Sequence, residues 1–262
     1  MKSVFLLLSA GSILTISVFA FSTKPTQHKT PDTETSKKQQ APSTAKPFVV
    51  LELFTSEGCS SCPSADAALR EVANQEGVCA IGFHVTYWNR LGWKDPFSMS
   101  SNDERQYQYA EKFKQSGVYT PQLIVNGEDE FVGSKKNQLA LSIQKALKQT
   151  PTANINLTST LKDTYIRVKY QLEGEYQNKA LKIAVVEKNI TSKVLKGENE
   201  GRSLQHDNIV RVFQTTDIQA TQSGETQITT NSSWNLKNCA VIAFIQDKQS
   251  LKILGASKAA IQ

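Results

Sequence analysis

The sequence predicts an α/β domain over residues 47–150, followed by a small antiparallel β-rich domain of sandwich type over residues 151–262. Continuous apolar runs at 48–54 and 78–87 are typical of strands buried on both faces of a mostly parallel sheet. A segment with the 3.6-residue apolar period of a helix follows each run. From residue 152 the pattern changes to strict alternation of apolar and polar residues, which is typical of strands with one buried face.

The composition is that of a globular protein. Of 262 residues, 39% are hydrophobic and 21% charged, which excludes a disordered chain, a coiled coil, a collagen-like fibre and a polytopic membrane protein. The formal net charge is +6, but no stretch of Lys and Arg is as dense as a nucleic-acid-binding arm. We therefore expect no nucleic-acid partner.

The N-terminus has the pattern of an export signal. Lys2 precedes an apolar stretch from Val4 to Phe21, and cleavage after Ala20 predicts a signal peptide over residues 1–20. The alternative is an uncleaved anchor, which would be the only membrane attachment that we expect. Residues 21–46 are rich in Thr, Ser, Pro, Gln and Lys, a composition that predicts a flexible linker. Both alternatives place the folded part outside the cytoplasm, in the periplasm or secreted.

The elements of the first domain are expected in the order strand, helix, strand, helix, strand, strand, helix. Pro63 stands in the first turn of the first helix, where its missing N–H costs nothing. Asn126-Gly127 predicts a hairpin, because such turns need positive φ. The ranges are 48–54 (strand), a helix from Cys59–Pro63 onward, 78–87 (strand), 88–97 (aromatic loop), 103–115 (helix), 122–125 and 130–132 (hairpin strands) and a helix from Ser134.

Two short motifs stand at meaningful places in this order. Cys59-Ser60-Ser61-Cys62 opens the first helix, and a Cys-x-x-Cys beside a βαβ pattern is typical of a thioredoxin-like redox domain. Thr120-Pro121 directly precedes the third strand, where thioredoxin-like folds have a cis-proline. X–Pro bonds adopt the cis form at small cost. We therefore predict a thioredoxin-like domain with a cis Thr120-Pro121 bond, the alternative being an ordinary trans turn.

Four strings resemble one specific family, the secreted family catalogued as domain of unknown function 1223. They are ELFTSEGCSSCPSAD, YWNRLGWKDPF, YTPQLIVNG and GENEGRSLQHDNIVR. The resemblance covers most of the chain after the linker. It implies a thioredoxin-like fold with an appended β-rich region, and it implies no substrate, because the family has none assigned.

The cysteine pair predicts thiol–disulfide exchange. A thiolate is the nucleophile, and a Cys at a helix N-terminus ionises more readily because unpaired N–H groups face its sulfur. We expect Cys59 to attack and Cys62 to resolve the mixed disulfide, with Thr120 and Pro121 beside them. Glu57 disfavours a thiolate, so no extreme oxidant is expected. The predicted function is an exported thiol–disulfide oxidoreductase that acts on protein or small-molecule thiols, exchanges electrons with a redox partner and needs no bound cofactor.

Two other functions remain open. The first is a metal-binding or delivery module that uses the cysteines and His84, although a lone strand histidine is more often packed and hydrogen-bonded, and we expect no metal site. The second is a non-enzymatic interaction protein with a structural disulfide. Trp88 and Trp93 are candidate substrate-binding residues, and the alternative is that they close the core under a long loop.

Four further side chains have two interpretations each. Cys79 and Cys239 are either separate buried thiols or a bridge between the domains. Glu52, in the strand before the cysteines, either assists proton transfer or is satisfied by a neighbouring Lys, Arg or backbone group. His206 ends a polar loop at 196–208 and either reaches the cysteine site or lies on the surface.

About seven short strands are expected in the second domain.

Overall fold

Two parallel strands, β1 (Val49–Thr55) and β2 (Val78–His84), form the centre of the α/β part of the chain. The computed structural model describes residues 46–218 and 222–262. The predicted signal peptide and all of the predicted linker except Lys46 lie outside these residues. No helix in the described part is long and apolar enough to cross a membrane.

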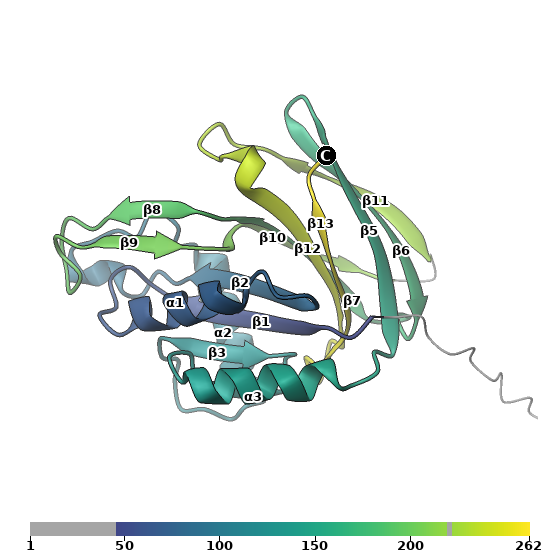
Figure 1. Cartoon of the computed structure of the whole chain (residues 1–262), viewed down its shortest axis with the longest axis horizontal. Helices are drawn as coiled ribbons and strands as arrows, with labels where there is room; N and C mark the ends of the chain where they lie inside the picture. The colour runs from purple at the N-terminus through teal and green to yellow at the C-terminus, as the bar shows by residue number, and fades with distance from the viewer. Residues whose placement is uncertain (1–45, 219–221) are drawn as a thin grey trace, which may run out of the picture. The chain divides into compact units, whose positions relative to one another are not determined.

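Helices cover both faces of this parallel pair (Figure 1). One face packs against α1 (Cys62–Val72) and α3 (Lys136–Leu147), and the opposite face packs against α2 (Ser100–Lys112). Every residue of β1 and β2 is buried for this reason, which accounts for their continuous apolar sequences. A short 3₁₀ helix (Asn89–Leu91) lies in the loop after β2.

The predicted hairpin and element order of residues 47–150 are confirmed. β3 (Gln122–Val125) pairs antiparallel with both β1 and β4 (Asp129–Val132). Its turn passes through Asn126 and Gly127, which have φ of 49° and 66°. Gly127 is required there, because an added Cβ would lie 1.9 Å from the Leu251 carbonyl oxygen.

The sequence predicted a mostly parallel sheet in the α/β part, but the sheet is mixed and continues into the β-rich part. One mixed sheet of eight strands, in the order β13-β12-β7-β10-β2-β1-β3-β4, runs through both predicted domains. The described residues accordingly belong to one compact unit. The four C-terminal strands of this sheet are β7 (Ala180–Glu187), β10 (Ile209–Asp217), β12 (Cys239–Gln246) and β13 (Ile253–Ala260).

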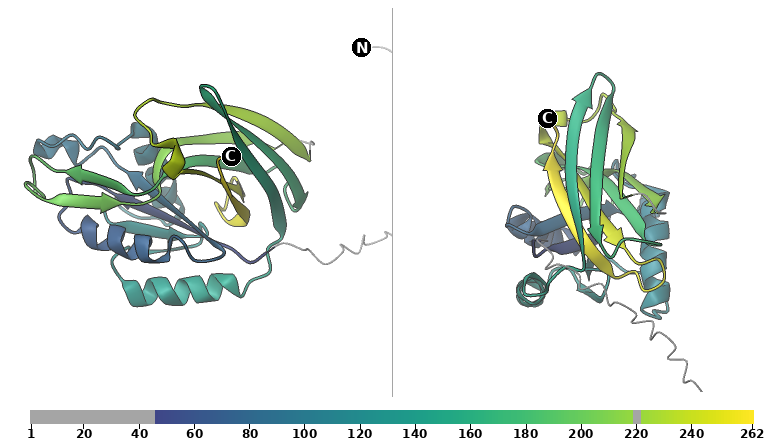
Figure 2. Two further views of the ribbon diagram at one scale, coloured as in Figure 1. Left: turned by 45° about the horizontal axis from the view of Figure 1, so that its top comes forward. Right: turned by 90° about the vertical axis from the view of Figure 1, so that its right-hand side faces the viewer.

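The α/β part and the β-rich part are joined through β7 and β12, which are buried on both faces. Alternate residues of these strands point into two different cores, one shared with α2 and one shared with a second sheet. That second sheet has three strands, in the order β11-β6-β5, and packs beside β12 and β13 (Figure 2). Its strands are β5 (Ala153–Lys162), β6 (Tyr165–Gly174) and β11 (Ser223–Thr229).

A two-stranded hairpin, β8 (Ile190–Lys193) and β9 (Ser203–His206), stands apart from both sheets and contacts α1. The sequence predicted only a polar loop there. With it, the described part of residues 151–262 contains nine strands instead of about seven. Short polar strands such as these lack the apolar run or clean alternation by which a strand is predicted.

Glu52 and Arg105 form an ion pair inside the core. Both side chains are buried, and the Glu52 carboxylate accepts hydrogen bonds from Arg105 and from the Tyr109 hydroxyl. The Arg105 guanidinium lies within 6 Å of four aromatic ring centres, a favourable position for a desolvated cation. Glu52 therefore fits its second interpretation, an acid satisfied by a neighbouring cation.

Cys79 and Cys239 are separate buried thiols, so the interpretation as a bridge between domains is wrong. Burial raises the pKa of each thiol to about 11. Both are therefore protonated near neutral pH.

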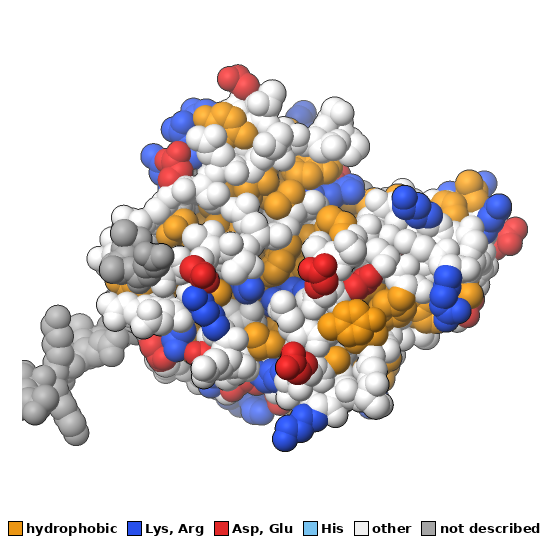
Figure 3. Space-filling model, turned by 180° about the vertical axis from the view of Figure 1, so that it is seen from behind, with side chains coloured by type: hydrophobic (Ala, Val, Ile, Leu, Met, Phe, Trp, Pro, Cys, Tyr) orange, Lys and Arg blue, Asp and Glu red, His pale blue; other side chains and the backbone are white. Residues whose placement is uncertain are grey.

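The surface seen from behind carries acidic and basic side chains in an interspersed pattern (Figure 3). Hydrophobic side chains are also visible between them on this face. The absence of a nucleic-acid partner stays a prediction.

The core ion pair gives a test of the fold. We expect Arg105→Met to lower the free energy of unfolding by about 3–5 kcal/mol, because it leaves the Glu52 carboxylate buried without its cation. Urea unfolding of the purified protein measures this. Lys136→Met is the matched control, since the Lys136–Glu71 pair is more than half exposed and is worth less than about 1 kcal/mol. Equal losses in the two variants would contradict the assignment.

Candidate active site around Cys59 and Cys62

The candidate site lies where the parallel strands β1 and β2 end. Thr55 and His84, the last residues of the two strands, pair with each other in register. The loops that follow them therefore meet at the same edge of the sheet, the position where open α/β sheets bind ligands. The Glu57 N–H donates a hydrogen bond of 2.8 Å to Asp95 of the second loop.

Cys59 and Cys62 form a disulfide, with a Cα–Cα distance of 5.4 Å. Cys62 is the first residue of α1, and Cys59 lies in the preceding turn rather than in the helix. Ser61, at the N-cap, makes no capping side-chain bond, and the first turn contains no acidic residue. The field of the helix N-terminus at the sulfurs is therefore not offset by a first-turn carboxylate.

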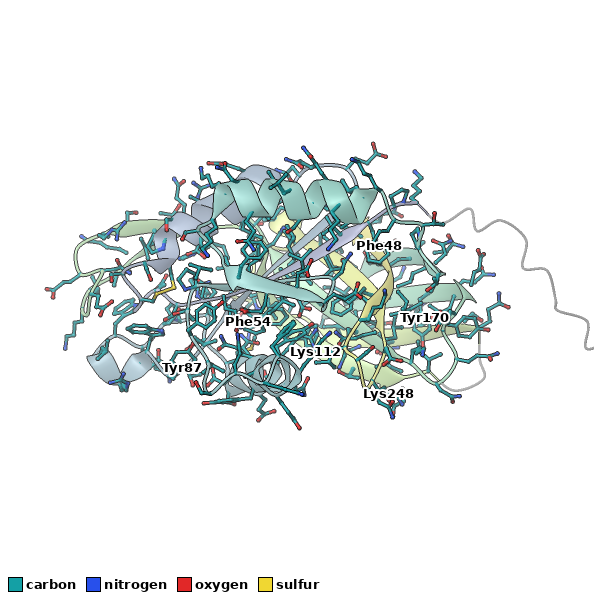
Figure 4. All side chains as sticks on the ribbon, turned by 90° about the horizontal axis from the view of Figure 1, so that it is seen from below. Phe48, Phe54, Tyr87, Lys112, Tyr170 and Lys248 are labelled. Carbon is teal, nitrogen blue, oxygen red and sulfur yellow. A yellow bond between two sulfur atoms is a disulfide. The ribbon has the colours of Figure 1, made fainter. Side chains whose placement is uncertain are left out.

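Both cysteines are almost fully covered, with exposed fractions of 1% for Cys59 and 0% for Cys62. The two serines between them are exposed. In Figure 4 the disulfide lies at the end of the molecule where Tyr87 is labelled, opposite Tyr170 of the three-stranded sheet. Solvent reaches the edge of the motif but little of the sulfur atoms.

The Thr120-Pro121 bond is cis, as predicted. Trp88 connects this turn to the cysteine loop. Its indole N–H donates a hydrogen bond of 2.8 Å to the Thr120 hydroxyl. Its Cβ lies 3.0 Å from the position that a Cβ on Gly58 would occupy, so a side chain at 58 would require Trp88 to shift by a few tenths of an ångström.

Trp93 also contacts the loop that contains the cysteines. Its indole N–H donates a hydrogen bond of 2.8 Å to the Glu57 carboxylate. Like Trp88 it is only half-buried, so part of each ring faces solvent. The structure thus brings both tryptophans to the cysteine loop, and a role in substrate binding stays a prediction.

The β8–β9 hairpin supplies two residues that sequence reasoning missed. The Asn199 side-chain amide donates hydrogen bonds to the carbonyl oxygens of Glu57 (2.8 Å) and Cys59 (2.9 Å). Glu198 accepts the Ser60 N–H at 2.9 Å, which lowers the pKa of Glu198. The only signal was the polar string around these residues, which does not indicate what it contacts.

His206 also reaches the site, as one of its two interpretations predicted. Its Nε2 lies 3.1 Å from the Glu57 carboxylate, and its Nδ1 lies 3.6 Å from the Asp66 carboxylate on α1. All three side chains are buried. Burial by itself lowers the pKa of His206, but Asp66 and Glu57 outweigh it and raise the pKa to about 9. His206 is therefore charged at neutral pH.

His84 is buried and bonded to an acid, so it fits the interpretation of a packed, hydrogen-bonded histidine. Its Nδ1 lies 2.7 Å from Asp95, and its ring contacts the ring of His206 with 4.9 Å between centres. Burial raises the pKa of Asp95, but its bonds with His84 and two backbone N–H groups prevail and lower it. Within residues 46–218 and 222–262, no three His, Cys, Asp or Glu side chains are arranged to hold a metal ion.

The charge on His206 makes stability depend on pH. Its pKa in the folded protein is above the usual 6.5, so its stabilisation is complete below about pH 6.5 and is lost as the pH rises through about 9. We expect His206→Gln to be less stable than the natural protein at pH 6.5, with this difference shrinking by about 3 kcal/mol at pH 10. Urea unfolding at the two pH values measures it. A difference independent of pH would contradict a charged His206.

The contacts of Asn199 predict that the hairpin protects the disulfide. We expect Asn199→Ala to accelerate reduction of Cys59–Cys62 by dithiothreitol, because the cysteine loop loses two hydrogen bonds that hold it. The rate is measured by trapping free thiols over time. Lys193→Ala is the control, since Lys193 lies on β8 of the same hairpin and its side chain is exposed. A rate equal to that of the control would contradict the protective role.

Comparisons with known proteins agree with the resemblance of the four sequence strings. The chain is 31% identical over 101 residues to a thioredoxin from Methanocaldococcus jannaschii, which is 38% of this chain and 96% of that protein. It is similar to a crystal structure of a protein from Agrobacterium tumefaciens, with 29% identity, a TM-score of 0.63, and 82% of this chain and 95% of that chain covered. The family model described as "Protein of unknown function (DUF1223)" matches residues 50–246. The chain therefore belongs to the DUF1223 family.

Proposed function

We propose that this protein is an exported thiol–disulfide oxidoreductase whose α/β part is thioredoxin-like. The observation that carries the proposal is the Cys59–Cys62 disulfide directly at the N-terminus of α1. The cis Thr120-Pro121 bond, tied to the cysteine loop through Trp88, supports it. The similarity to a thioredoxin over 101 residues supports it as well.

The proposed reaction is a two-step exchange. A substrate thiolate attacks the Cys59 sulfur, the Cys59–Cys62 bond breaks, and Cys62 leaves as a thiolate that takes up a proton. A second substrate thiol loses its proton and attacks the substrate sulfur of the mixed disulfide, which releases Cys59. The substrate gives up two electrons and two protons and becomes a disulfide. Run backward, the same steps reduce a disulfide.

The surrounding residues have distinct proposed roles. The positive end of the α1 dipole, at the helix N-terminus, stabilises the thiolates. Thr120 and Pro121 shape the backbone beside the sulfurs, and the exposed parts of Trp88 and Trp93 contact the substrate. The substrates are protein or small-molecule thiols in the periplasm or outside the cell, and a redox partner restores the starting state. No bound cofactor is needed.

A structural disulfide in a non-enzymatic interaction protein is the second candidate. The near-complete burial of both sulfurs favours it, because exchange requires a partner sulfur to reach one of them. The two candidates differ in whether the cysteines equilibrate with external thiols.

The test is a redox titration of the purified protein. The protein is equilibrated with graded ratios of reduced and oxidised glutathione, and free thiols are trapped and located by mass spectrometry. We expect a reversible two-electron transition at Cys59 and Cys62 that Cys59→Ser abolishes. Cys79→Ser is the matched control and keeps the transition, because Cys79 is a buried, protonated thiol. No transition at any ratio would support the structural disulfide.

A further inference from the structure

We propose that His206 is a positioning residue that compensates the buried negative charge beside Cys59 and Cys62 and thereby stabilises their reduced form. The proposal rests on the proposed function. It assigns to the β8–β9 hairpin a part in setting the reduction potential of a cysteine pair about 145 residues earlier in the chain.

Two buried carboxylates flank the cysteine pair in sequence, in addition to the exposed Glu198 that accepts the Ser60 N–H. Glu57 is two residues before Cys59, and Asp66 is four residues after Cys62, one turn along the same face of α1. Both are buried, with exposed fractions of 0% and 9%. Opening the disulfide releases a thiolate near these acids, and a like charge in a desolvated place disfavours it.

His206 is placed between the two acids. One ring nitrogen lies 3.1 Å from Glu57 and the other 3.6 Å from Asp66. His206 is on β9, which packs against α1. The Arg70 guanidinium of α1 donates a hydrogen bond of 3.3 Å to the carbonyl oxygen of Gln205, the residue before His206 in β9. Neither Glu57 nor Asp66 reaches another cationic side chain within ion-pair distance in the described part of the chain.

The other groups that face His206 do not replace its charge. His84 contacts its ring and is engaged by Asp95. Phe97 also contacts the ring, and the Arg211 guanidinium lies over Phe97 while pairing with Glu187. From the loop after β2, Trp93 donates a neutral hydrogen bond to Glu57.

The charge count gives opposite expectations for two substitutions. Glu57, Asp66 and charged His206 sum to −1. His206→Gln changes the sum to −2 and destabilises the thiolates, whereas Asp66→Asn changes it to 0 and stabilises them. A merely structural role for the cluster would make both substitutions act in the same direction, because each removes one buried interaction.

The experiment is the glutathione equilibrium at pH 7 with both variants. We expect the constant for reduction of the disulfide to fall about tenfold in His206→Gln and to rise about tenfold in Asp66→Asn, shifts of about 30 mV for a two-electron couple. The rate of Cys59 alkylation against pH is a second readout, with the pKa of the Cys59 thiol raised in the first variant and lowered in the second. Lys193→Gln is the control, since it removes an exposed positive charge from the same hairpin and should change neither value.

The outcomes separate the two proposals. If the natural protein shows no transition, the proposed function fails. If it shows one and the variants shift in the same direction, or neither shifts by more than the control, this inference fails and the function stands. Unfolding curves establish that each variant folds. Should His206→Gln not fold, His206→Lys decides, because a retained positive charge between the two acids should keep the constant near that of the natural protein, and a tenfold fall would overturn the inference.

Discussion

A hydrogen bond of 2.8 Å from the Gly82 N–H to the Asn208 carbonyl oxygen marks the junction on which the rest of the structure depends. There β10 lies beside β2, and Ile209 pairs with Gly82 in parallel register. The junction joins the α/β strands and the β-rich strands into one sheet. Because β9 ends directly before it, the β8–β9 hairpin is held next to α1 and next to the cysteine loop.

This placement gives the candidate site contributions from both the α/β part and the β-rich part of the chain. The N-terminal part provides the disulfide, the helix N-terminus and the cis-proline turn. The hairpin provides Asn199, which binds the backbone of the cysteine loop, and His206, which lies between two acids. A cysteine pair whose surroundings are set by a distant segment can differ in reduction potential from one with the same local sequence.

Two of the groups of buried charge in the described part of the chain have different environments. Glu52 of β1 and Arg105 of α2 form an ion pair among aromatic rings, where each charge has an oppositely charged partner and further hydrogen bonds. Glu57, Asp66 and His206 lie at the edge of the sheet with two acids for one cation. The first arrangement is complete and stabilises the fold. The second has more acids than cations beside the cysteines, and a charge near a thiol shifts the pKa of that thiol.

The sequence by itself determined the features that depend on neighbours in the chain. These are the order of elements in residues 47–150, the helix that starts at the cysteines, the cis-proline and the family. The tertiary structure decided which distant residues meet: β7, β10, β12 and β13 in the sheet of β1, Arg105 beside Glu52, and Asn199 and His206 beside Glu57. The apolar periodicity of a strand indicates that one of its faces is buried, but it does not indicate which element covers that face. A polar loop has no such periodicity and therefore gives no indication of its contacts. Side-chain partners that are 53 to 149 positions apart in the sequence are therefore brought together only when the sheet assembles.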